Sequence, residues 1–181
     1  MLYGKLCNVK NMNRMFALSK IETVNLSSFD TSKVTNMSWT FMSSSFKSLD
    51  LSNFDTSKVT SMSYMFAYSS FEKLNLSSFN TSNVVNMSNM FEQCKKLKTI
   101  YASNRFVTDN VTSSSGMFRD SLYLKSGAGT SFSSSHTDKE YARIDGGTSS
   151  LHLRIIRSLS SFYFVYFFRN FCYNLSVRRM I

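Results

Sequence analysis

The 181-residue chain has no proline, only three cysteines and only two histidines. The cysteines are odd in number and far apart, so their spacing indicates neither a disulfide framework nor a zinc site. His136 and His152 do not stand at ligand spacing, so we expect neither a metal centre nor a cofactor. The longest dense apolar run, FYFVYFF at 162–168, is shorter than the roughly 18–20 residues that span a bilayer. We therefore predict no transmembrane segment.

The motifs that mark common catalytic sites are also missing. His136 and Asp138 lie near many serines, but no G-x-S-x-G elbow precedes a helical pattern. The GAG turn at 127–129 is not followed by the lysine of a phosphate-binding loop. We therefore expect no enzymatic activity. The N-terminal stretch MLYGKLCNVKNMNRMF lacks the apolar region of an export signal, so no signal peptide is recognised in this chain.

The formal charge of +10 is unevenly distributed. Residues 1–150 hold 16 of the 21 Lys and Arg residues and all 11 acidic residues, whereas the last 31 residues hold five arginines and no acid. Half of the basic excess thus belongs to a tail of different composition. No recognised motif or basic-aromatic stripe accompanies the charge, so nucleic-acid binding is not predicted.

A segment of eleven residues occurs three times at intervals of 25 residues. It reads SSFDTSKVTNM at 27–37, SNFDTSKVTSM at 52–62 and SSFNTSNVVNM at 77–87. Phenylalanines follow the same phase at positions 16, 41, 66, 91 and 118, and valines follow it at positions 9, 34, 59, 84 and 111. Several series of apolar residues thus recur at the same spacing. This predicts a stack of similar coils, because a single coil is too small to bury its own apolar side.

Each repeat combines two periodicities. In ETVNLS at 22–27, apolar and polar residues alternate, which predicts a short strand. Val34, Met37 and Phe41 follow at i, i+3 and i+7, which predicts a short helix with Asp30 as its N-cap, repeated by Asp55 and Asn80. Parallel strands stack at about 4.8 Å, whereas helices prefer about 8–10 Å. We therefore predict an α/β solenoid with parallel strands on its concave face and short helices on the opposite face.

The unit LDLSNFDTSKVTSMSYMF at 49–66 resembles the repeat of the BspA-like leucine-rich-repeat surface proteins of bacteria, which includes a repeat first described as a mycoplasma domain of unknown function. Cys94 and Leu97 fit the cysteine and leucine of that repeat, although two other repeats are one residue shorter and lack the cysteine. The segment SSSHTDKEYARIDGG at 133–147 is similar to one that closes such arrays. The resemblance covers roughly residues 6–148.

The resemblance implies a cell-surface or secreted protein that binds a host matrix protein or a bacterial surface protein. We expect a five-coil array at 1–118 with an incomplete first coil, a closing segment at 119–148 and a basic aromatic tail at 149–181. The tail is interpreted as out of frame or disordered, and the alternative is an amphipathic segment that contacts a membrane. The alternative to adhesion is a truncated fragment of a longer surface protein without independent function.

The outward positions of the strands are the candidate binding residues, because repeat arrays bind partners on such extended faces. These positions form two columns across the coils. The first column contains hydroxyl and amine side chains, and the second ends in an aromatic residue of a type that anchors interfaces. The two columns are Thr23, Ser48, Lys73 and Thr99, and Asn25, Asp50, Asn75 and Tyr101.

Overall fold

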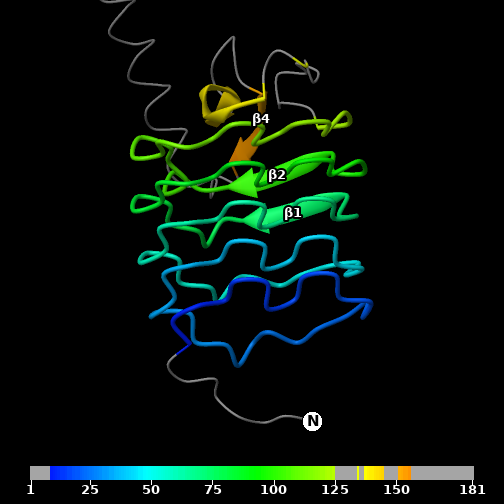
Figure 1. Ribbon diagram of the computed structural model, residues 1–181, viewed down its shortest axis with the longest axis vertical. Coiled ribbons are helices and arrows are strands. Elements are labelled where there is room, and N and C mark those ends of the chain that lie inside the picture. The colour runs from blue at the N-terminus through cyan, green and yellow to red at the C-terminus, as the bar shows by residue number, and fades with distance from the viewer. Residues whose placement is uncertain (1–8, 125–133, 135–136, 145–150, 156–181) are drawn as a thin grey trace, which may run out of the picture.

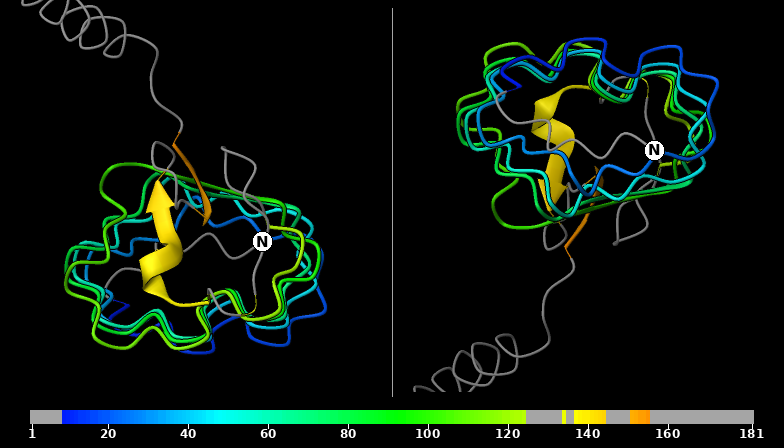
Figure 2. Two further views of the ribbon diagram at one scale, coloured as in Figure 1. Left: turned by 90° about the horizontal axis from the view of Figure 1, so that it is seen from above. Right: turned by 90° about the horizontal axis from the view of Figure 1, so that it is seen from below.

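The computed structural model describes residues 9–124, 134, 137–144 and 151–155. The chain winds into coils that lie on top of one another (Figure 1), and the coils nearly coincide when viewed along the stack (Figure 2). Isolated parallel bridges join Asn11 to Asn36, Asn36 to Ser61, Ser61 to Asn86, and Asn86 to Ser113. We number the coils from these residues, so coil 1 begins at Asn11 and coil 5 at Ser113.

One side of the stack carries the strands. Strand β1 (Lys73–Leu76) of coil 3 pairs in parallel with β2 (Thr99–Ala102) of coil 4, and Lys73 lies opposite Thr99. The predicted alternation is confirmed here, because the second and fourth residues of both strands are buried. The matching segments of coils 1 and 2, at 23–26 and 48–51, hold no assigned strand. We call residues 23–26, 48–51, 73–76 and 99–102 the strand side.

The opposite side, at 11–19, 36–44, 61–69, 86–94 and 113–121, is called the turn side. Its amide groups alternate between two kinds of partner. In coil 1, Arg14 and Phe16 donate to the carbonyls of Ser38 and Thr40 in coil 2, at 3.1 and 2.9 Å. The amides between them close local turns, such as Met15 N–H to Met12 C=O at 3.1 Å. Every second amide therefore ties one coil to the next, and the others bend the chain.

The predicted helices are wrong for the described residues, where η1 (Lys139–Tyr141) is the only helical element. On the turn side, φ is 57° at Arg14 and 59° at Leu18, and the corresponding residues of coils 2 to 5 also have positive φ. Positive φ at the third residue of a turn is the conformation of a type II turn and interrupts a right-handed helix. Asp30, Asp55 and Asn80 have no helix to cap, and each accepts from the amide two residues ahead in an Asx turn.

The predicted curvature of the stack depended on a layer of helices opposite the strands, which the described residues do not contain. Backbone hydrogen bonds join adjacent coils on both the strand side and the turn side. Both sides therefore have the short spacing of paired backbones, and no thicker helical layer opens one side of the stack. The strand side is accordingly described as a flat side rather than a concave one, in keeping with the overlying coils of Figure 2.

The repeated apolar residues form a continuous core between the two sides. The rings of Phe16, Phe41, Phe66, Phe91 and Phe118 stack along the array, with neighbouring centroids 5.5–5.8 Å apart. The valines at 34, 59, 84 and 111 are buried, and Val9 packs against the core. Cys94 is also buried, and burial raises the pKa of its thiol to about 11, so it packs as a neutral side chain.

The last coil ends against residues 137–139. Gly116 N–H donates to Asp138 Oδ1 at 2.9 Å, Phe118 N–H donates to the Thr137 carbonyl at 2.8 Å, and the Lys139 ammonium donates to the Val111 carbonyl. The first two contacts satisfy amide donors of the kind that bond to the following coil elsewhere in the array. They lie within the predicted closing segment at 119–148, although residues 125–133, 135 and 136 are outside the described residues.

The sheet extends beyond the predicted boundary at residue 149. Strand β4 (Leu151–Ile155) pairs in parallel with β2, and β3 (Ala142–Ile144) pairs in parallel with β4, which gives the order β1-β2-β4-β3. Residues 151–155 of the predicted tail therefore continue the sheet of the strand side. Residues 156–181 lie outside the described residues, and so does the prediction made for them.

Candidate binding face

The eight candidate residues all lie on the strand side with their side chains directed away from the core. Six of them are exposed, and Thr99 and Tyr101 are partly buried. Strand pairing places Lys73 beside Thr99 and Asn75 beside Tyr101. The register continues from Tyr101 to Arg154 of β4, which the sequence did not indicate. The predicted columns are therefore adjacent in space where the strands are paired.

The column of Asn25, Asp50 and Asn75 has a second role within the chain. The Oδ1 atom of each residue accepts from the amide two residues ahead, in Ser27, Ser52 and Ser77, at 3.0 Å. Hydrogen bonds from the Ser52 hydroxyl and amide lower the pKa of Asp50, so this exposed carboxylate is ionised at neutral pH. One oxygen of each side chain thus shapes the end of the strand, and the rest of the side chain faces solvent.

Two ion pairs cross between coils where the strand side begins. Lys47 contacts Glu22 at 2.5 Å, and Lys98 contacts Glu72 at 2.9 Å. The Lys98 ammonium also lowers the pKa of Glu72. Because all four side chains are largely exposed to water, we expect these pairs to contribute little to stability. They place alternating charge at one edge of the candidate face.

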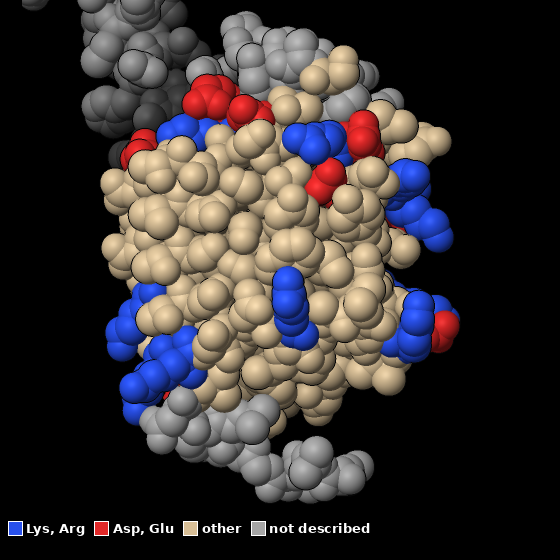
Figure 3. Space-filling model, viewed as in Figure 1, with Lys and Arg blue, Asp and Glu red and all other residues tan. Residues whose placement is uncertain are grey.

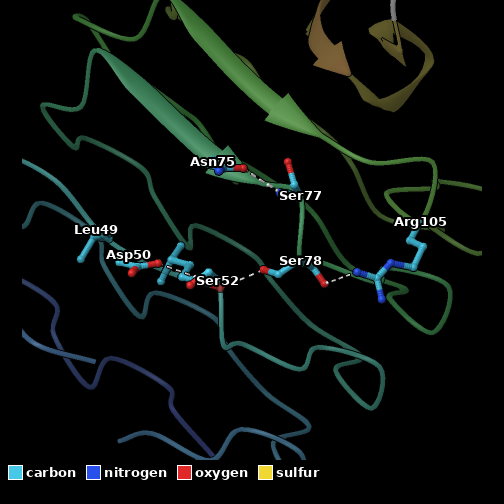
Figure 4. A pocket seen from close by; sticks show the side chains of 8 residues that line it. Leu49, Asp50, Ser52, Asn75, Ser77, Ser78 and Arg105 are labelled. Atoms are coloured by element: carbon cyan, nitrogen blue, oxygen red, sulfur yellow. Dashed lines mark hydrogen bonds between the residues drawn. The ribbon is translucent and has the colours of Figure 1, made fainter. Parts of the chain in front are cut away.

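A polar groove lies at the other edge, just beyond the ends of the strands. Two adjoining hollows of ≈ 440 and ≈ 430 Å³ share Ser52, Ser78 and Arg105. Figure 4 shows Asp50 and Ser52 from one coil, Ser77 and Ser78 from the next, and Arg105 beyond them. Asp50 and Asn75 are the predicted site residues that line it. Its walls combine hydroxyl, amide, carboxylate and guanidinium groups with Leu49 and Leu51.

The sequence interpretation missed the groove and Arg105. Arg105 directly precedes Phe106, which belongs to a second phenylalanine register with Phe29, Phe54 and Phe79. The place of Arg105 is taken by Ser28, Asn53 and Ser78 in the earlier coils. This position varies among Ser, Asn and Arg in the repeats, whereas the phenylalanine that follows it does not vary. That variation is a usable signal, because a position that carries no repeated packing role is available for recognition.

A second missed feature is an aromatic column on the turn side. The ring of Trp39 stacks on that of Tyr64 with centroids 4.2 Å apart, and the guanidinium of Arg14 lies 5.1 Å from the Trp39 centroid. Trp39 is therefore covered on both faces by its own chain. This stack stabilises the outer surface of the coils, and it leaves the edges of the Trp39 ring, not its faces, for a partner.

Other sites of chemistry can be assessed for part of the chain. The described residues hold no group of three His, Cys, Asp or Glu side chains that could bind a metal ion. Asp138 caps the last coil, whereas His136 lies outside the described residues. Among the described residues, no helix has the length and apolar character needed to cross a membrane.

Charged side chains are sparse on the face seen in Figure 3, where uncharged residues cover most of the surface. The described residues of that face form no continuous basic patch. The positive net charge of the chain is therefore not gathered into a broad electrostatic surface on this face, which is what binding to a phosphate backbone requires.

Comparison with known proteins gives one match. No curated protein and no solved structure matched the chain. A family described as "Mycoplasma protein of unknown function, DUF285" matches residues 10–130, which are 121 of the 181 residues and include all the repeated segments. The match falls within the range 6–148 that the repeat resemblance covers. The chain belongs to this family of repeat-containing proteins, DUF285.

Proposed function

We propose that the protein is a non-enzymatic, leucine-rich-repeat-like solenoid of the BspA-like kind, and that it acts at the cell surface by binding another protein through its strand side. The observation that carries the proposal is the set of outward side chains that the stacked coils bring into adjacent columns. Membership of a repeat family supports a structural or binding role, since repetition supplies extended surface and a catalytic site is needed only once.

The chemistry of the face suits protein recognition. Tyr101 offers a large side chain that loses little conformational freedom on binding, and Lys73 and Asp50 supply charges of opposite sign near it. The neighbouring hydroxyl and amide groups provide a polar rim around this aromatic residue. A partner that spans β1 and β2 would contact residues from at least two coils.

The test is binding of the purified full chain to a panel of immobilised extracellular-matrix proteins, measured by surface plasmon resonance. Against the matrix protein that binds, Tyr101→Ala should weaken affinity by about tenfold or more, and Lys73→Ala and Asp50→Ala should weaken it less. Tyr68→Ala and Lys58→Ala are matched controls, because both residues are exposed and lie away from the strand side.

All variants should retain the melting temperature of the natural chain. Equal affinity of the three strand-side variants and the two controls would remove the strand side from the binding site. Failure of a folded chain to bind any protein in the panel would contradict adhesion to matrix.

A further inference from the structure

In coils 2, 3 and 4, the residue directly before the phenylalanine at 54, 79 or 106 reaches back to a carbonyl of the previous coil. Asn53 shows the contact most fully, because its Nδ2 donates to the carbonyls of Leu26, Ser27 and Phe29 at 3.1, 3.4 and 3.0 Å. These three carbonyls point to the same place, at the end of the strand-side segment 23–26 of coil 1. One amide group is enough to satisfy all of them.

The same point in coil 2 is only partly filled. Ser78 takes the place of Asn53, and its shorter side chain donates to the Leu51 carbonyl alone, at 2.8 Å. The carbonyls of Ser52 and Phe54, which correspond to those of Ser27 and Phe29, accept no hydrogen bond from any described residue. Both residues line the hollows at this corner. The groove thus occupies the space that an asparagine fills one coil earlier.

Two carboxylates border this space. Asp50 lies in the wall beside Ser52, and Asp55 lies in the wall beside Phe54. Each carboxylate gives one oxygen to its own Asx turn, and hydrogen bonds from Ser52 and Ser57 lower the pKa of Asp50 and Asp55 respectively. Two ionised carboxylates and two open carbonyls therefore border one small groove.

Arg105 limits the groove on the side of coil 4. Its Nη2 donates to the Ser78 carbonyl at 3.3 Å, so its charge lies at the end of the groove and not at the open carbonyls. Ser77 also lines the groove, and its buried hydroxyl oxygen has no hydrogen-bond partner among the described residues. With two carboxylates and one guanidinium in its lining, the groove is polar and has a net negative charge.

We propose that this groove binds the guanidinium group of an arginine side chain on the protein partner. The guanidinium would donate to the carbonyls of Ser52 and Phe54, as the Asn53 amide does in coil 1, and to the carboxylate of Asp50 or Asp55. A planar group with five donors suits several acceptors that surround one space. The proposal rests on the proposed function and deepens it, because the groove borders the strand side.

The test titrates the ¹⁵N-labelled full chain with N-acetyl-arginine amide and follows backbone amide shifts. We expect saturable shifts at Ser52, Asp55 and Ser57 with a dissociation constant on the order of millimolar, as fits one small charged group. N-acetyl-citrulline amide has a similar shape without the charge, and it should bind at least about tenfold more weakly. Since both probes have similar size, the difference isolates the charge-assisted contacts.

Ser78→Asn is the decisive variant. The new side chain can occupy the groove as Asn53 does in coil 1, so the variant should fold and should lose the shifts. Ser28→Asn makes the same substitution in the same column of coil 1 and should leave probe binding unchanged. Asp50→Asn with Asp55→Asn provides a second check, with an expected loss of about tenfold or more in affinity.

The absence of saturable shifts at these amides would overturn the proposal, and so would full binding by Ser78→Asn. The arginine probe also separates this inference from the function on which it rests. Tyr101→Ala should retain probe binding while it loses affinity for the matrix protein. If the probe fails but Tyr101→Ala still weakens partner binding, the groove inference alone is wrong.

Discussion

At the scale of single residues, buried threonine hydroxyls replace backbone groups between coils. Thr56 Oγ1 accepts from the Asn80 amide and donates to the Asn80 carbonyl, both at 2.8 Å. Thr31 makes the same two contacts with Asp55 in the coil before. One hydroxyl thus supplies both the donor and the acceptor that the backbone of a neighbouring strand would supply. The repeated threonine is therefore a backbone substitute, a role that its sequence context does not reveal.

We predict that Thr56→Val lowers the free energy of unfolding by about 2–3 kcal/mol, because two backbone groups of Asn80 lose their partner at a buried site. Urea denaturation of the full chain measures the change. Thr56→Ser keeps the hydroxyl and should lose less. Thr60→Val is the surface control, since Thr60 is exposed and its hydroxyl makes one hydrogen bond, of 3.1 Å. We expect a change within about 0.5 kcal/mol. Equal losses at Thr56 and Thr60 would contradict the pairing role.

At the scale of the element, the turn side shows why an apolar pattern can mislead. In coil 3, the buried residues Met62, Met65, Phe66 and Ser69 stand at i, i+3, i+4 and i+7. This is the pattern of a helix face, but here consecutive turns direct the same positions inward. Periodicity alone cannot separate the two structures. The abundance of Ser, Thr and Asn was the contrary signal, because these residues favour turns over helix interiors.

Positive φ makes the turn side testable with glycine. Asn89 has φ of 56° and lies within the helix predicted after Asn80, whereas its neighbour Ser88 has negative φ. We predict that Asn89→Gly leaves the melting temperature unchanged or raises it, because glycine adopts positive φ without strain. Ser88→Gly should lower stability by about 0.5–1 kcal/mol. A helix would lose stability at both positions, so comparable losses in the two variants would contradict the turns.

The parts of the fold that could be predicted are those fixed by side-chain type. The stacked phenylalanines and the strands β1 and β2 follow from repetition and from alternation. The groove could not be predicted, because it depends on the length difference between Asn53 and Ser78 at one corner. β4 was missed for another reason: the composition of residues 151–155 differs from the repeats, and parallel pairing across such a distance leaves no local pattern.

At the scale of the whole molecule, each coil is held mainly by its neighbours. Phe66 lies between Phe41 and Phe91 with ring centroids 5.7 and 5.8 Å away, and the amides of the turn side bond to the following coil. Such an array has approximately additive stability, with one interface for each pair of coils. The unit of the structure is therefore the complete coil. For stability, the alignment of core positions between coils matters more than the exact residues of any one coil.

Deletion of residues 50–74 tests this unit directly. The deletion joins Leu49 to Asn75, which occupies the place of Asp50 one coil later, so the core phase and both ends of the stack are kept. We predict a folded chain that melts cooperatively at a lower temperature and has a smaller urea m-value, because less surface is exposed on unfolding. Deletion of residues 50–61 is the control, since it removes about half a coil and places core residues out of register. Circular dichroism with urea denaturation distinguishes the two, and similar behaviour of both deletions would show that stacking in phase does not hold the molecule together.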